Sequence, residues 1–313
     1  MSEKRTLSSS TPRSSKRAKE DYDWRLTLST PQTFKTTLAI VEPTVANVPF
    51  QVCMEDDTEE GAGFMGLRMD AMNSSKVCMV KTAYRCQVDV STVLCNPTFC
   101  VKTDILRSVL CDVDASHVVE ITRYRDSDKL VILGYSADSS DVSKSEICLL
   151  HDDTNIHQLD MYSLTFNYVV EIELERLKKV CAIASRINSS VVEFSVGSDD
   201  TNTNYFTIHA EGDSCNVSKV YQSRSICADG DETRLAVDPI VNKDTEAFSG
   251  CRDLETHFKG AFPTVYLAGV LKSMERQTIQ LYMNPDMPLV LHYGLGDDMS
   301  YIKIVLAPRQ VGV

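Results

Sequence analysis

The sequence has no apolar run of the roughly 20 consecutive residues that a membrane-spanning helix needs. Its first residues, MSEKRTLSSSTPRSSKRAKED, contain no apolar segment, so we expect no secretory signal peptide. Positive charge is also in deficit, because 32 lysines and arginines stand against 44 aspartates and glutamates, a formal net charge of −12. This balance excludes a protein coated in positive charge. A local basic surface is still compatible with this charge, because binding to nucleic acid depends on where the basic residues lie. Without an apolar run of spanning length, we expect no membrane partner.

The eleven cysteines include no C-x-x-C pair, and their number is odd. The six histidines do not fall at zinc-finger spacings near any cysteine pair. These absences argue against a disulfide framework and against a zinc site, so we expect reduced cysteines that mostly serve as small core residues. We predict no metal and no cofactor.

One stretch imitates a cofactor motif. Gly61-Ala62-Gly63-Phe64-Met65-Gly66 fits G-x-G-x-x-G, the dinucleotide-binding fingerprint. That fingerprint requires a buried strand before it and a helix after it. Here an acidic loop precedes it, and residues 67–72 alternate apolar and polar, which predicts a strand. We interpret the match as accidental. Since no nucleophile–base–acid set or Walker loop stands out either, we expect no enzyme.

The 313 residues, 43% of them hydrophobic, suffice for one large domain or two ordinary ones. Residues 1–21 are polar and basic, and we expect a disordered tail there. Its run Lys16-Arg17-Ala18-Lys19 fits either a nuclear-import signal or an electrostatic tether. An ordinary solvated tail explains it equally well.

Hydrophobic periodicity predicts many strands and few helices after residue 23. The predicted helices cover 34–45, 103–113, 174–188 and 265–274. The predicted strands cover 76–82, 118–123, 129–135, 168–174, 191–196, 205–209, 278–283, 289–293 and 301–306. The order of strand, helix, several strands, helix, several strands recurs after residue 164. This recurrence indicates an internal duplication and an α+β fold.

The helix at 174–188 is amphipathic. Leu174, Leu177, Val180, Cys181 and Ala184 share one face at 100° per residue. The opposite face concentrates basic residues around Lys179 and Arg186, with Glu175 among them and with Arg176 and Lys178 at its flanks. Such a surface is either ordinary solvated protein or one that follows a phosphate backbone.

Four stretches carry a family resemblance. They are LRMDAMNSSKVCMV (67–80), SEICLLHDDTNIHQLDMYSLTFNYVV (145–170), PDMPLVLHY (285–293) and YIKIVLAPR (301–309). In this order and spacing, the chain resembles the eukaryotic-type DNA sliding clamps, the proliferating cell nuclear antigen family, over about residues 23–310. The resemblance implies a closed ring of three identical subunits, each with two similar domains whose helices line a hole around duplex DNA.

The resemblance also implies a function. The chain would be a polymerase processivity factor in DNA replication and repair. Its expected partners are double-stranded DNA, further copies of itself, DNA polymerase, the clamp loader ATPase and other proteins with a docking peptide. Its expected location is the nucleus or a viral replication compartment. The implied divisions are a tail (1–21), an N-terminal domain (22–143), a linker (144–163) and a C-terminal domain (164–313).

Five positions match or adjoin basic hole-facing positions of the family: Lys35, Arg107, Lys178, Lys179 and Lys272. Arg186, on the basic face of the helix at 174–188, is the sixth residue that we expect to face DNA. Four others depart, because Thr36, Asp104, Ala182 and Val265 stand where the family usually has a basic residue. We therefore expect a hole that is less positive than usual.

The partner-docking groove of the family maps onto Met72, Val77, Leu159, Met161, Tyr162, Pro288, Val305, Leu306, Ala307 and Pro308. Each could instead be a simple packing residue. Asp160, Tyr162 and Val305 replace a usual Gly, Pro and Tyr, so the preferred peptides would differ. The region 222–259 is longer than in the family, and nothing in the sequence explains it.

Two other readings stay open: a subunit of a heterotrimeric checkpoint clamp, and a monomeric viral-type processivity factor. A homotrimer is expected because the strands 129–135 and 216–221 would be unpaired edges in a monomer, and unpaired edges attract another strand.

Overall fold

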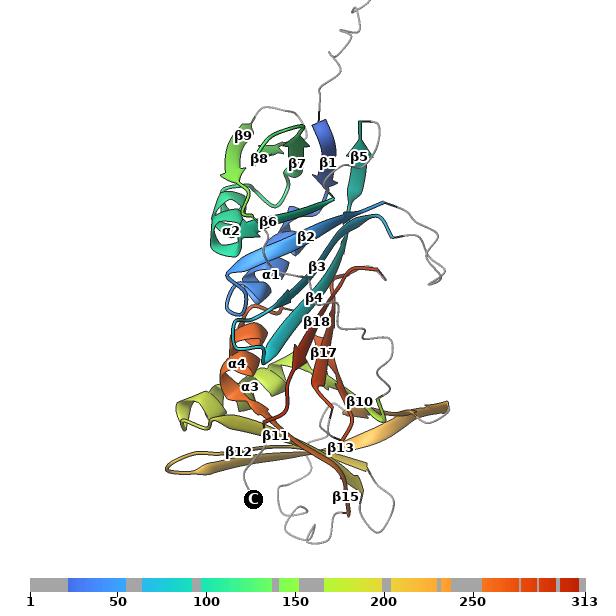
Figure 1. The fold of residues 1–313 in the computed structure, drawn as a ribbon. Helices are drawn as coiled ribbons and strands as arrows, with labels where there is room; N and C mark the ends of the chain where they lie inside the picture. The colour runs from blue at the N-terminus through green and yellow to red at the C-terminus, as the bar shows by residue number, and fades with distance from the viewer. Residues whose placement is uncertain are drawn as a thin grey trace, which may run out of the picture.

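The computed structural model describes residues 22–54, 64–91, 97–136, 141–151, 166–198, 204–229, 232–237, 255–275, 277–285, 287–296 and 299–309. The tail at 1–21, residues 152–163 of the predicted linker, residues 164–165 and most of the region 222–259 beyond residue 237 lie outside these ranges. Within them the fold is α+β, with four helices on mostly antiparallel sheets (Figure 1).

The first half of the chain runs from residue 22 to residue 148. Its elements are β1 (Tyr22–Leu28), α1 (Pro31–Val41), β2 (Asn47–Cys53), β3 (Gly66–Met72), β4 (Cys78–Arg85), β5 (Gln87–Val90), β6 (Thr98–Lys102), α2 (Thr103–Cys111), β7 (Val118–Tyr124), β8 (Lys129–Tyr135) and β9 (Val142–Cys148).

The second half follows the same plan. Its elements are β10 (Tyr168–Glu173), α3 (Leu174–Arg186), β11 (Val191–Ser198), β12 (Asn204–Glu211), β13 (Asn216–Asp229), β14 (Glu232–Val237), β15 (Glu255–Pro263), α4 (Thr264–Lys272), β16 (Thr278–Met283), β17 (Leu289–Gly294) and β18 (Tyr301–Leu306). All four predicted helices are confirmed, each with boundaries within a few residues, and so are the predicted strands.

Strand pairing repeats between the halves. The antiparallel pairs β1–β7, β7–β8 and β8–β9 correspond to β10–β16, β16–β17 and β17–β18. The pairs β2–β3, β3–β4 and β2–β6 correspond to β11–β12, β12–β13 and β11–β15. The strands β5 and β14 are the exceptions, because β5 pairs antiparallel with β1 and β14 pairs in parallel with β10. The agreement of the other pairs supports the predicted duplication more strongly than element order does.

A detail at the helix starts repeats as well. Thr103 begins α2 and Thr264 begins α4, and both side chains are buried. The Thr103 amide donates to the carbonyl of Ala46, just before β2, at 2.9 Å. The Thr264 amide donates to the carbonyl of Ser190, just before β11, at 3.1 Å. The equivalent helix in each half is therefore fixed to the equivalent strand by the same bond.

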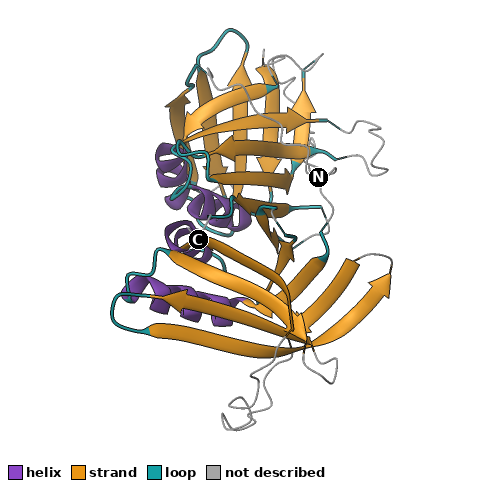
Figure 2. Ribbon diagram, turned by 60° about the horizontal axis from the view of Figure 1, so that its bottom comes forward, coloured by secondary structure: helices purple, strands orange, loops and turns teal. Residues whose placement is uncertain are grey.

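The two halves are joined through one strand pair, β18 with β4, which is antiparallel with Tyr301 opposite Ala83 and Leu306 opposite Cys78. This pair makes one sheet in the order β15-β11-β12-β13-β14-β10-β16-β17-β18-β4-β3-β2-β6, and a second sheet runs β5-β1-β7-β8-β9. The helices gather in one column on the same side of these sheets, in the order α2, α1, α4, α3 (Figures 1 and 2). Contacts between α1 and α4 connect the two helix pairs.

The structure around Gly66 explains why the G-x-G-x-x-G match is not followed by a helix. It begins β3 with φ of +153°, and a Cβ there would lie 2.1 Å from the carbonyl oxygen of Tyr84. The glycine is therefore needed for close strand packing, and a strand follows it instead of a helix. The prediction that residues 67–72 form a strand is confirmed; Gly61 and Gly63 lie outside the described residues.

The predicted edge at 129–135 was wrong. The strand β8 is interior, paired with β7 on one side and β9 on the other. The edge on this side of the sheet is β9, and β5 is the edge on the other side. The strand β9 runs across the predicted start of the linker at residue 144. Sequence reasoning missed β9 because only Ile147 among its residues is a buried apolar side chain, and a mostly polar strand leaves a weak hydrophobic signal.

The second predicted edge is confirmed for part of a longer strand. Residues 216–222 of β13 pair with β12, whereas pairing with β14 begins only at Ser223. No described strand lies on the other side of residues 216–222. After residue 222, β13 continues to Asp229, and β14 pairs antiparallel with it and in parallel with β10.

Candidate functional site

The helix column presents the predicted DNA-facing cations, and they fall into two groups. Lys179, Arg186 and Lys272 are exposed and make no ion pair or hydrogen bond within the described residues. The other three are held by groups of the protein itself. The Lys35 ammonium donates to the carbonyl of Val113, and the Arg107 guanidinium bonds the Glu42 carboxylate.

Lys178 completes the second group. Its Nζ lies 3.0 Å from Glu175 Oε1 and 2.6 Å from the carbonyl oxygen of Met274. On the same helix, Arg176 Nε bonds Glu173 Oε2 at 2.8 Å. Glu42 and Glu175 offset the charges of Arg107 and Lys178, because each carboxylate carries one negative charge. The carbonyl of Val113 leaves the charge of Lys35 in place and only restrains its ammonium group.

The positions that depart from the family pattern reduce the positive charge further. Asp104 is exposed in the first turn of α2, where its carboxylate accepts from the amide of Ile105 at 2.8 Å. Val265 is 69% exposed and Ala182 is exposed, so both present apolar surface on the helices. The helix face is therefore mixed in character rather than strongly basic.

The opposite face of the large sheet carries an apolar row. Directly paired residues on five neighbouring strands form it, and we call them the outer apolar row: Met72, Met79, Val305, Val290 and Tyr282. Their chain neighbours, except Asn73 after Met72, belong to the hydrophobic core, so the row lies on the side away from the helices. Met79, Val290 and Val305 are buried, and Phe166 packs against the row with its ring centroid 5.7 Å from that of Tyr282.

Met72 is the open end of this row. Its side chain is 38% exposed, and few other large apolar side chains in the described residues are exposed. An exposed methionine that continues a buried apolar row is an adaptable anchor point for another apolar group.

The predicted docking residues have different environments. Val305 lies within the outer apolar row, and Leu306 is fully buried in the core, where its side chain offers no surface. Val77 and Ala307 are half-buried and joined by a bond from the Ala307 amide to the Val77 carbonyl at 2.9 Å. Pro308 is exposed and Pro288 is half-buried. Leu159, Met161 and Tyr162 lie outside the described residues.

A cavity of about 500 Å³ adjoins this end of β18. The Arg309 amide donates to the Ala261 carbonyl at 2.8 Å and so holds the chain end against β15. Pro308, Arg309, Met287 and Asn284 line one part of the cavity; the remaining lining comes from Glu193 and residues 258–262. The walls mix apolar with charged side chains, and Lys259 Nζ lies 3.0 Å from Glu193 Oε1.

Sequence reasoning missed Met79, Val290, Tyr282 and Phe166. Each looks like an ordinary strand or loop residue in the sequence. Only the cross-strand register aligns Met79, Val290 and Tyr282 with Met72 and Val305, and Phe166 reaches the row only by packing against it. Register between strands far apart in the chain leaves no local signal.

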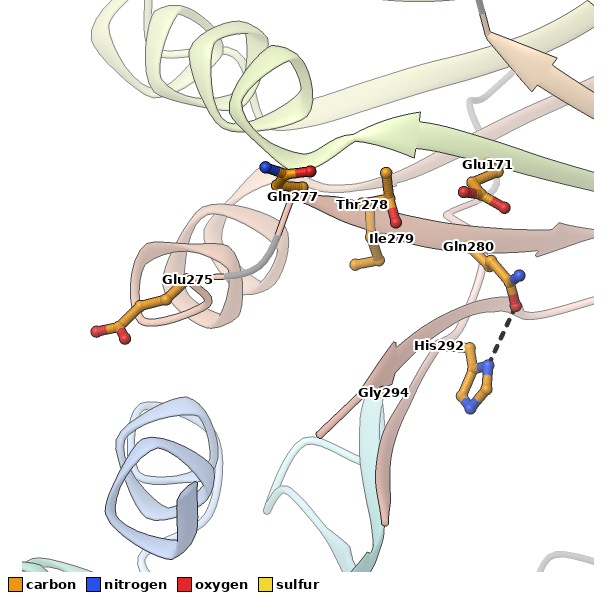
Figure 3. A pocket seen from close by; sticks show the side chains of 8 residues that line it. All are labelled: Glu171, Glu275, Gln277, Thr278, Ile279, Gln280, His292 and Gly294. Carbon is orange, nitrogen blue, oxygen red and sulfur yellow. Dashed lines mark hydrogen bonds between the residues drawn. The ribbon is translucent and has the colours of Figure 1, made fainter. Parts of the chain in front are cut away.

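A second cavity, of about 550 Å³, opens beside β10, β16 and β17 (Figure 3). Glu171, Gln280 and His292 lie together along one wall, while Glu275 lies apart from them. His292 Nδ1 is 3.2 Å from Gln280 Oε1, an acceptor, so this nitrogen carries the proton. Burial, assisted by the nearby charge of Lys303, lowers the pKa of His292 to about 4.

This histidine gives the fold a defined pH dependence. An unfolded histidine has a pKa near 6.5, so as pH falls below that value the unfolded state binds a proton that the folded state does not. The stabilising contribution of neutral His292 is thus complete above pH 6.5 and is lost as pH falls toward 4.

We expect His292→Gln to remove this loss. Relative to the variant, the wild type should lose about 2 kcal/mol of unfolding free energy between pH 7 and pH 4.5, allowing for the partial exposure of the ring. Urea unfolding of both proteins at the two pH values measures the difference. Parallel pH profiles would contradict it, since the carboxylates that also titrate there are common to both proteins.

The described cysteines do not form disulfides. Burial raises the pKa of Cys78, Cys86 and Cys181 to about 12, so these thiols are unreactive, whereas Cys111, Cys148 and Cys215 are exposed. In the described ranges no cluster of three histidines, cysteines or carboxylates could hold a metal ion. None of the described helices is long and apolar enough to cross a membrane.

These observations define the class of structure: a duplicated α+β chain with all described helices on one side, an apolar row on the other, and an unpaired strand edge in each half. No protein-family model matches the sequence.

Proposed function

We propose that the chain is the subunit of a DNA sliding clamp, a homotrimeric ring that encircles duplex DNA and keeps a polymerase and other replication and repair proteins attached. The observation that carries this proposal is the repeated strand pairing together with two of the open strand edges, β9 and residues 216–222 of β13. Both edges belong to elements whose counterparts already pair with each other inside the chain.

The repetition indicates how the ring would close. By their positions in the two halves, β18 corresponds to β9 and β4 corresponds to β13. Inside the chain, β18 pairs with β4. The edge β9 of one copy would pair in the same way with β13 of the next, which is a head-to-tail contact that closes a ring when the rotation allows.

The internal pair also sets the register of this contact. Aligning the buried positions of the halves places Ile304 with Ser145, and Val80 with Val217. Since Ile304 lies opposite Val80, Ser145 would lie opposite Val217, and Val142 opposite Val220. Val142 is 60% exposed on the free edge, as an interface residue would be in a single chain.

The two faces of the subunit fit the two tasks of a clamp. The helix column would line the hole, and its few free cations would contact phosphates loosely enough to allow sliding. The outer apolar row, its open end at Met72 and the cavity at Pro308 would receive short peptides of the polymerase, the clamp loader ATPase and other replication proteins. The clamp would act in the nucleus or in a viral replication compartment.

Two alternatives give different assemblies. A heterotrimeric checkpoint clamp would use β9 and β13 with chains of other sequence, and a monomeric processivity factor would leave both edges unpaired. A monomer held by charge alone would also need a stronger basic face than the described helices provide.

We expect the purified chain to have the mass of three subunits in size-exclusion chromatography with light scattering. Edge pairing on both sides of each subunit gives the physical reason, and the number three comes from the family resemblance. A species that stays monomeric at micromolar concentration would rule out the closed homotrimer, and assembly only with other chains would support the checkpoint clamp.

A further inference from the structure

The two helix pairs differ in charge. With their capping residues, α1 and α2 carry three cations, Lys35, Lys102 and Arg107, against three anions, Glu42, Asp104 and Asp112. The same count for α3 and α4 gives five cations against two anions. One pair is therefore electroneutral, and the other has a formal charge of +3.

Contacts within the protein sharpen the difference. In the first half, Lys35 and Arg107 are bound to Val113 and Glu42, and the exposed Lys102 stands two residues from Asp104. Both anions of the second pair are likewise used up, because Glu173 bonds Arg176 and Glu175 bonds Lys178. The positive charge that is left over on the helices is therefore the formal charge of +3 on α3 and α4.

The three cations without a neutralising partner in the described residues lie on two helices that pack together, α3 and α4. Lys179 and Arg186 lie seven residues apart on α3, which puts them on one line along the helix, about 10 Å apart. Lys272 ends α4, the helix packed against α3. All three side chains are exposed and stand on the same helix column (Figure 1).

We infer that duplex DNA is held by the helix pair of the C-terminal half alone, through Lys179, Arg186 and Lys272, while α1 and α2 form a neutral wall. This inference rests on the proposed function and adds which part of the hole makes the phosphate contacts. In such a ring, sectors that bind phosphates alternate with neutral sectors. The duplex would therefore lie closer to the helices of the C-terminal halves than to α1 and α2. Fewer contacts per subunit also mean weaker retention and a smaller salt dependence than a fully basic hole would give.

The test compares two matched triple variants. One carries Lys179→Gln, Arg186→Gln and Lys272→Gln; the other carries Lys35→Gln, Lys102→Gln and Arg107→Gln. Each removes three charges per chain, and glutamine keeps a donor for Val113 and Glu42. Fluorescence anisotropy with a labelled 30-base-pair duplex, from low to moderate salt, gives the affinity and its salt slope. Circular dichroism and light scattering confirm that each variant is folded and assembled.

We expect the first variant to lose at least tenfold in affinity at low salt. Its slope of log K against log salt should also flatten by about one to three, because each lost phosphate contact removes about 0.9. The second variant should stay within twofold of the wild type. Equal losses in both variants, or no loss in either, would overturn the inference and leave the clamp proposal standing. A wild-type protein that binds no duplex at low salt would instead count against the clamp proposal itself.

Discussion

A variant with Val142→Cys and Val220→Cys is expected to form three covalently joined chains under mild oxidation, visible as a single large species in a denaturing gel. In the proposed ring, the register of the internal β18–β4 pair would put these two residues directly opposite each other on neighbouring subunits. Directly opposed residues of antiparallel strands have Cα atoms about 4.5–5.5 Å apart, which is within the range of a disulfide.

The single variants and the wild type are the controls. In a head-to-tail ring, Val142→Cys alone meets no second introduced cysteine, so it should give only the background of the native Cys148 and Cys215 thiols. Strong two-chain crosslinking of that single variant would show that β9 pairs with β9 of another copy. Such an isologous dimer cannot be the proposed ring.

The inter-subunit junction would be more polar than the junction inside the chain. The core-facing residues that meet inside the chain are almost all apolar: Ile302, Ile304 and Leu306 on β18, with Cys78, Val80 and Thr82 on β4. Their counterparts at the open edges are Ser143, Ser145 and Ile147 on β9, with Val217 and Lys219 on β13 and Cys215 just before β13 begins. Less apolar burial means a weaker junction, so a ring of this chain would open between subunits before its halves come apart.

Replacement of Met72 by Asp is expected to abolish most of the affinity for partner peptides, by tenfold or more, or at least about 1.4 kcal/mol. A carboxylate at the open end of the outer apolar row would have to lose its water when an apolar peptide side chain docks there. Stability should change little, since the Met72 side chain is 38% exposed. Titration of a labelled peptide from a polymerase or ligase tail, followed by anisotropy, measures the effect.

Val265→Asp is the matched control, because it puts the same charge on an exposed apolar position of the helix face. Peptide affinity should be unchanged in this variant. Leu159→Ala, which rests on the family resemblance, should cost about tenfold if the linker joins the same groove. Full affinity of Met72→Asp, with the protein folded, would place peptide docking elsewhere or show that there is none.

Local sequence patterns predicted the elements of this fold well. The apolar face of α3, at Leu174, Leu177, Val180, Cys181 and Ala184, is buried as its periodicity indicates. The strands β8, β16 and β18 begin and end at the predicted residues. Helical and strand periods are set by neighbouring residues, so the chain encodes them locally. The duplication followed from the order of these elements.

Only the tertiary structure decided which strands are edges and which charges are free. The polar strand β9 became the edge in place of β8 because strand order depends on pairing between distant segments. The Arg107 guanidinium forms an ion pair with Glu42. The Lys178 ammonium donates a hydrogen bond to the carbonyl of Met274, a residue 96 positions away. Charge and register of this kind arise from contacts between segments far apart in sequence. The sequence alone could therefore determine the elements and their repetition, but not the surface that they build together.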